Sequence, residues 1–171
     1  MNRLKFFVPK HVLLTLYNSL VLPYLNYSVV TWGGSSSCDR LFILQKRAIR
    51  LISGASFREH TLPLFANLKL LQFNDLYYLN VGKFMYKFMN GFLPSCFNHY
   101  FTLTSDIHCH NTRSIKNKNL HVGFSRTTLF KISLIQRGIR YWNSLSLSLK
   151  TSLTLPIFMS QLKIQLLASY V

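Results

Sequence analysis

The charge balance is the feature that most restricts what this chain can fold into. Its 171 residues include 20 Lys and Arg but only 4 Asp and Glu, which gives a formal net charge of +16. Because so few acids cannot pair with all the cations inside a fold, most cations have to lie on the surface. A surface of one sign repels itself and calls for an anionic partner, of which nucleic acid is the commonest and an anionic membrane the next.

The scarcity of acids also argues against one class of enzyme. The four acids are Asp39, Glu59, Asp75 and Asp106, and no two of them are close in sequence. Two-metal phosphoryl transfer needs carboxylates clustered around a pair of Mg²⁺ ions. We therefore predict that the chain has no polymerase active site and is not an enzyme. Asp39 and Asp75 are better explained as residues that stabilise helix N-termini.

The cysteine and histidine pattern predicts neither a metal site nor a cofactor. His108-Cys109-His110 suggests a metal site, but adjacent ligands rarely reach one tetrahedral ion, and no second ligand pair completes the set. The three cysteines, Cys38, Cys96 and Cys109, are widely spaced and odd in number. They give no disulfide framework and fit a reducing, intracellular compartment.

Helical periodicity dominates the chain, of which 49% is hydrophobic. Apolar spacing predicts helices over about 10–32, 39–53, 72–90 and 132–145, and a last one from Pro156. The alternation of Leu120, Val122 and Phe124 with other residues predicts a short strand. The expected fold is thus mainly α, an irregular helical bundle with a small β-hairpin in the C-terminal half. We expect a helical region over 1–101 and a basic region over 102–171 packed on it.

The segment Val12–Trp32 carries no charge and is long enough to span a bilayer. It also contains Asn18, Pro23 and Asn26, which are costly in lipid. A helix buried on most sides and kinked or split at Pro23 is therefore the favoured interpretation. The alternative is a small basic membrane-associated protein that uses residues 12–32 as its span.

Two groups of cations lack the interleaved Glu that surface helices use for i,i+4 pairs. In the 39–53 helix, the apolar residues Leu41, Leu44, Ala48 and Leu51 form one stripe and the cations lie mostly off it. Such single-sign groups favour phosphate contact over a merely solvated face. We predict nucleic-acid contacts for Arg40, Lys46, Arg47, Arg50, Arg113, Lys116, Lys118, Arg126, Lys131, Arg137 and Arg140.

Short motifs along nearly the whole chain resemble one family. They are Val8-Pro9-Lys10, Leu16-Tyr17-Asn18-Ser19-Leu20, Pro23-Tyr24-Leu25-Asn26-Tyr27, Trp32-Gly33, Leu44-Gln45-Lys46-Arg47-Ala48-Ile49-Arg50, His60-Thr61 with Pro63-Leu64-Phe65, Asp75-Leu76-Tyr77, Met85-Tyr86-Lys87, His110-Asn111-Thr112-Arg113, Asn119-Leu120-His121-Val122, Ser125-Arg126-Thr127, and Gly138 with Trp142-Asn143-Ser144-Leu145. In this order they resemble the region that follows the palm in non-LTR (LINE-like, jockey-like) retrotransposon reverse transcriptases.

The resemblance implies that residues 1–101 are thumb-like and that the helix around 44–50 grips a template–primer duplex through its backbone. The implied partners are an RNA/DNA duplex or single-stranded nucleic acid, together with the palm domain of a parent enzyme. A nuclear location is compatible with this origin. The family's catalytic aspartates, with its Tyr/Phe-x-Asp-Asp box, belong upstream, so no catalytic residue carries over.

One departure from the family pattern points to a copy that has drifted. Ser146-Leu147-Ser148 stands where the family usually has Pro and acidic residues, and Met1 falls inside what resembles a longer reading frame. We therefore expect a truncated element copy, that is, a non-catalytic fragment of an RNA-directed DNA polymerase. A remnant with no function is the third hypothesis.

Overall fold

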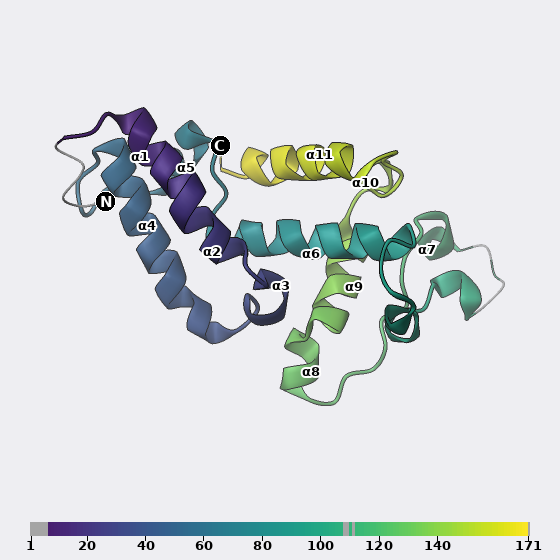
Figure 1. The fold of residues 1–171 in the computed structure, drawn as a ribbon. Coiled ribbons are helices and arrows are strands. Elements are labelled where there is room, and N and C mark those ends of the chain that lie inside the picture. Colours follow the sequence, from purple (N-terminus) through teal and green to yellow (C-terminus); the bar gives the residue numbers. More distant parts are fainter. Residues whose placement is uncertain (1–6, 108–109, 111, 171) are drawn as a thin grey trace. The chain divides into compact units, whose positions relative to one another are not determined.

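The computed structural model describes residues 7–107, 110 and 112–170. This part is 68% helical and contains eleven α-helices and no β-strand, so the prediction of a mainly α protein is confirmed (Figure 1). The helices are α1 (Lys10–Leu16), α2 (Leu22–Asn26), α3 (Val29–Trp32), α4 (Asp39–Ser53), α5 (Leu62–Leu68), α6 (Phe73–Met89), α7 (Arg113–Lys116), α8 (Thr128–Ile132), α9 (Leu134–Ser144), α10 (Leu147–Lys150) and α11 (Leu155–Ala168). A π-helical turn covers Tyr17–Val21, and 3-10 turns cover Ser36–Cys38, Ser95–Tyr100 and Thr104–Asp106.

The predicted β-hairpin is wrong for the part of the chain that the structure describes. An isolated antiparallel bridge joins Leu103 to Leu120, and Phe124 is 92% exposed. The backbone groups of Leu120 are bound by a side chain instead of a strand. The Asn143 Oδ1 accepts from the Leu120 N–H at 2.8 Å, and the Asn143 Nδ2 donates to the Leu120 carbonyl at 2.7 Å. An amide therefore occupies the place where a second ladder would form.

The chain groups into two compact units, which are described separately. Unit 1 comprises Met1–Tyr77 with Ile164–Val171, and unit 2 comprises Tyr78–Lys163. Close packing within a unit does not establish that a segment folds alone. The division into 1–101 and 102–171 therefore stays a prediction.

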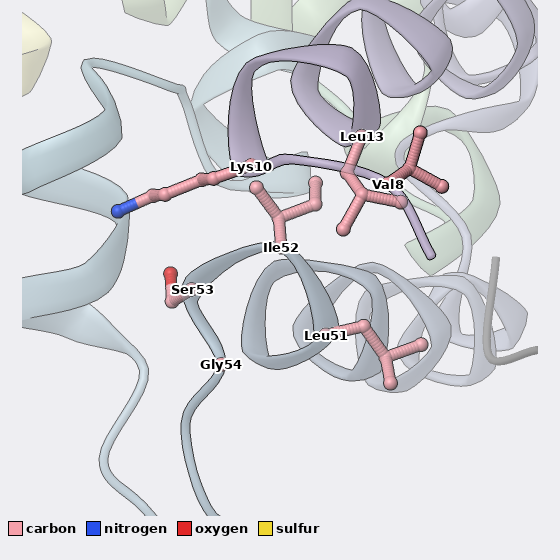
Figure 2. Close-up of a pocket in the computed structure, with 7 residues that line it drawn as sticks. All are labelled: Val8, Lys10, Leu13, Leu51, Ile52, Ser53 and Gly54. Atoms are coloured by element: carbon pink, nitrogen blue, oxygen red, sulfur yellow. The ribbon is translucent and has the colours of Figure 1, made fainter. Parts of the chain in front are cut away.

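In unit 1, α1 packs against α4, and their contact supports the basic helix from its inner side (Figure 1). Figure 2 shows the place where α1 begins beside the end of α4. Val8, Leu13 and Ile52 line a hollow of about 350 Å³ there, while Lys10 extends toward Ser53.

The helix that starts at Lys10 does not break at Pro23. Because Pro23 has no N–H, and because its ring would meet the carbonyl of Ser19 in a regular helix, the ladder has to adjust. The π turn over Tyr17–Val21 makes that adjustment, and the Leu22 N–H bonds the Tyr17 carbonyl five residues back. The helical run ends instead at Ser28, which has a left-handed φ of 46°.

The expectation that Val12–Trp32 is buried on most sides is also wrong. Leu13, Tyr17, Leu25 and Val29 are buried, whereas Leu20 is 59% and Tyr24 80% exposed within this segment. The run thus presents one face to the core and leaves the other open. Among the described residues, no helix combines the length and the apolar character needed to cross a membrane.

In unit 2 the core forms around aromatic residues of α6, α9 and α11. The ring of Phe158 stacks on Tyr86 at 4.7 Å between centroids and lies 6.2 Å from that of Trp142. Tyr86 is only 1% exposed and belongs to this core. Gly138 allows α9 to approach α6 closely, because a Cβ there would lie 2.8 Å from the Met85 sulfur.

Candidate nucleic-acid interface

Helix α4 has the bounds that its end signals predict. Asp39 stands in its first turn, where the helix dipole favours a carboxylate, and Gly54 follows its last residue with φ 70°. The buried side is not the predicted stripe, however. Gln45, Ile49 and Ile52 are buried, whereas Leu44 is 55% exposed.

A buried amide explains why the buried side of α4 differs from the predicted apolar stripe. Gln45 is only 2% exposed, and its Nε2 donates to the Tyr17 hydroxyl at 2.9 Å and to the Leu71 carbonyl at 3.0 Å. The Oε1 of the same amide has no partner within the described part of the chain. Burial raises the pKa of the Tyr17 phenol, which stays protonated. The amide thus fixes which side of α4 faces outward.

The four predicted cations of α4 lie on the side opposite this buried stripe. At about 100° per residue, they fall within an arc of about 120°. Arg40 and Arg47 are exposed and lie about 20° apart on the helix circumference, while Lys46 and Arg50 are half-buried. None of the four pairs with a carboxylate among the described residues. Their charge is available to an external anion.

Two of these four cations have contacts of their own within unit 1. The Lys46 ammonium lies 3.9 Å from the centroid of the Phe42 ring, one turn earlier. The Arg50 Nε donates to the Glu59 backbone carbonyl at 2.9 Å, while the Glu59 carboxylate accepts from the Ser56 N–H. Arg50 therefore also holds the loop after α4, and Arg40 and Arg47 are the least constrained of the four cations.

The seven predicted cations of the C-terminal half all lie in unit 2 but do not form one surface. Arg113 and Lys116 are on α7, and Lys118 follows that helix. Arg126 lies in the loop before α8, Lys131 is on α8, and Arg137 and Arg140 are on α9. Figure 1 shows α7 well apart from α8. In addition, the Lys118 carbonyl accepts from the Trp142 indole at 3.2 Å, on the side of α9 opposite Arg137 and Arg140.

The structure does bring Arg137 and Arg140 together with aromatic residues. Both line a hollow of about 300 Å³ that also includes Tyr78 of α6 and Tyr141 and Ser144 of α9. The two tyrosine rings lie 4.9 Å apart between centroids at 37°. Ser133 caps the N-terminus of α9 by accepting from the Gln136 N–H, which fixes where this face begins. We call this feature the α9 hollow.

Lys150 is a cation that the sequence does not single out and that the structure buries. It is 5% exposed, and its Nζ donates to the Asn119 Oδ1 at 2.8 Å and to the Asn117 carbonyl at 3.2 Å. Burial lowers the pKa of this amine. Its Ser- and Leu-rich surroundings carry no sequence signal of such a contact. Lys150 stabilises the fold and is not part of a phosphate-binding surface.

The acids do not assemble into a metal centre. Among the described residues, no three His, Cys, Asp or Glu side chains come close enough to hold a metal ion. Asp75 stands in the first turn of α6 and accepts a hydrogen bond from the Tyr170 hydroxyl. Burial raises the pKa of the Asp75 carboxyl. His108 and Cys109 of the His-Cys-His cluster lie outside the described residues.

Comparison with known proteins identifies no relative: no family model, no curated protein and no solved structure matches this chain.

Proposed function

We propose that the chain is a non-catalytic nucleic-acid-binding segment that corresponds to the region after the palm of a non-LTR retrotransposon reverse transcriptase. It holds the phosphate backbone of a template–primer duplex through the outer face of α4. The observation that carries this proposal is the group of four cations on that face. Arg40, Lys46, Arg47 and Arg50 share it, and none pairs with a carboxylate among the described residues. Several cations on one helix face can contact successive phosphates of a nucleic-acid backbone.

The motifs that carry the resemblance also meet in space, which supports the proposal. Tyr17 of one motif binds Gln45 of another. A Cβ at Gly33 would lie 2.7 Å from the Tyr77 ring, so these two motifs are in direct contact. Asn143 binds the backbone of Leu120. Such contacts are expected if these motifs belong to one structural unit of the parent enzyme.

The test is the salt dependence of binding between the purified chain and a labelled RNA–DNA hybrid of about 20 base pairs. Each phosphate contact adds about 0.9 to the slope of log affinity against log salt. The Arg40→Ala/Arg47→Ala variant should lower that slope by about 1.8 and weaken binding about 30-fold at 0.15 M salt. The loss should be the same for different sequences, because phosphates carry no sequence information.

The matched control is Arg58→Ala/Lys163→Ala, which removes the same charge from exposed positions outside the predicted clusters. We expect the affinity of this control for the hybrid to change less than about threefold, since cations that do not contact the duplex act mainly through screened long-range attraction. An equal loss in both variants would mean that net charge alone attracts the duplex. Absence of salt-sensitive binding by the unaltered chain would refute the proposed function.

A further inference from the structure

The α9 hollow has a composition that a phosphate-only surface does not need. Two guanidinium groups, from Arg137 and Arg140, stand one turn apart on α9 beside the paired rings of Tyr78 and Tyr141. Neither guanidinium pairs with a carboxylate or donates a side-chain hydrogen bond within the described residues. Both rings are half-buried and thus still present part of their surface to the hollow.

The size and walls of the hollow restrict its ligand. A volume of about 300 Å³ lies at the lower end of small-ligand sites. Guanidinium groups bind phosphate in a bidentate manner, and tyrosine rings offer a flat apolar surface for a base or sugar. One nucleotide unit combines these two requirements at the right scale. A duplex cannot supply it, because its bases stay paired and stacked inside the helix.

The geometry points to a nucleotide-binding site for single-stranded nucleic acid in this hollow. One phosphate of the strand lies between Arg137 and Arg140, and its base packs against the tyrosine pair. The inference rests on the proposed function, and it separates two roles within it. The outer face of α4 holds duplex phosphates, whereas the α9 hollow holds an unpaired nucleotide.

The experiment compares the affinity of the full chain for two labelled single strands of about ten units, one with bases and one fully abasic. The abasic strand keeps every phosphate and loses only base contacts. Stacking of one base contributes about 1–3 kcal/mol, so the strand with bases should bind about 5- to 140-fold more tightly. Tyr78→Leu should bring this ratio close to one, whereas Tyr78→Phe, which keeps the ring, should preserve it.

Variants that remove cations show which part of unit 2 is responsible for the preference for the strand with bases. Arg137→Ala/Arg140→Ala should weaken the strand with bases and also lower the ratio, because the base is no longer held at the rings. Arg113→Ala/Lys116→Ala removes the same charge from α7 in the same unit, and it should weaken both strands alike and leave the ratio unchanged. Circular dichroism melting of each variant shows whether it is folded.

Three outcomes of these experiments can be told apart. Equal affinity of the unaltered chain for both strands overturns the nucleotide site, even if salt-sensitive duplex binding through α4 persists. A ratio that survives Tyr78→Leu in a folded protein also overturns it, since the base would then bind elsewhere. Loss of duplex binding in Arg40→Ala/Arg47→Ala with the ratio retained supports both the proposed function and the separate site.

Discussion

Helices α4 and α9 are built alike on the inside and differently on the outside. Each buries a glutamine that is 2% exposed, Gln45 in α4 and Gln136 in α9. In each case the amide Nε2 donates to a loop carbonyl, that of Leu71 at 3.0 Å and that of Gly123 at 3.2 Å. In each case the Oε1 has no partner among the described residues.

The outer faces of the two helices differ in what accompanies the cations. Arg40 and Arg47 of α4 project from an exposed face, whereas Arg137 and Arg140 of α9 border a hollow walled by two tyrosines. In the proposed roles, the outer face of α4 holds a long polyanion and the α9 hollow holds a single nucleotide. What distinguishes the α9 hollow is the aromatic surface that Tyr78 of the neighbouring helix contributes beside its two arginines.

The largest effect is expected from the hydrogen bonds of the buried Lys150 ammonium. Lys150→Met leaves the Asn119 Oδ1 and the Asn117 carbonyl without their donor. Because each unsatisfied buried acceptor costs about 1–3 kcal/mol, we expect a loss of about 2–3 kcal/mol in the free energy of unfolding. Urea denaturation at pH 7 measures it. A variant as stable as the parent would show that the buried cation does not hold α9.

The difference in unfolding free energy between the parent and Lys150→Met depends on pH, and the pKa shift of Lys150 sets the direction of that dependence. Burial lowers the folded-state pKa of Lys150 below its usual value of 10.5, so in that window the unfolded chain binds more protons. Below the folded pKa the burial of the charged amine therefore costs part of the stability, and this cost is relieved as the pH rises from the folded pKa to 10.5. Lys150→Met should lack this rise toward alkaline pH in denaturation curves.

The second effect is a change in preference between duplex and single strand. Arg40→Ala/Arg47→Ala should weaken duplex binding about 30-fold at 0.15 M salt, and Arg137→Ala/Arg140→Ala should change it less than about threefold. For a single strand with bases the order should reverse. Fluorescence anisotropy with both ligands gives the two ratios. If both variants shift both ligands equally, α4 and α9 do not have separate roles.

A smaller effect separates the α4 cations from one another. Arg50→Ala removes the hydrogen bond from its Nε to the Glu59 carbonyl and should lower the free energy of unfolding by about 1 kcal/mol. Arg47→Ala, an exposed site with no such bond, should stay within about 0.5 kcal/mol of the parent. Thermal melting measures both. Equal melting temperatures would mean that Arg50 is free for phosphate like its neighbours.

The smallest effect concerns the start of α6. Burial raises the folded-state pKa of Asp75 above its usual value of 3.8, so its stability contribution is present below pH 3.8 and is lost as the pH rises through the folded pKa. Asp75→Asn keeps an acceptor for the Tyr170 hydroxyl and removes the titration. The stability of the variant relative to the parent should therefore increase from pH 3.5 to 7. A constant difference would contradict the raised pKa.

The bounds of α4 could be read from the sequence, but its orientation could not. Asp39 and Gly54 mark the bounds of α4 locally, through the dipole and the left-handed cap. Its buried side depends on Gln45, whose partners Tyr17 and Leu71 are 28 and 26 residues away. Hydrophobic spacing alone favours burial of Leu44 over burial of Gln45. It cannot show that the tertiary fold places two hydrogen-bond acceptors beside the Gln45 amide.

Sequence reasoning about the site had the same limit. The cations of α4 were recognisable because they share one helix and one sign. The place of Tyr78 beside Arg137 was not recognisable, since Tyr78 belongs to a helix about 60 residues earlier in the chain and its spacing favours a core residue. The predicted hairpin failed for a similar reason. Asn143 binds the Leu120 backbone from 23 residues away.

The π turn at Tyr17–Val21 makes this part of the chain sensitive to its length. The turn accommodates one more residue than a regular helix would, which rotates everything after it by about 100°. Deleting one residue there would restore the regular ladder, direct Pro23 against a carbonyl and turn Tyr24 and Leu25 to new directions. Substitutions at these positions change a side chain, but an insertion or deletion changes which face of the helix meets α4.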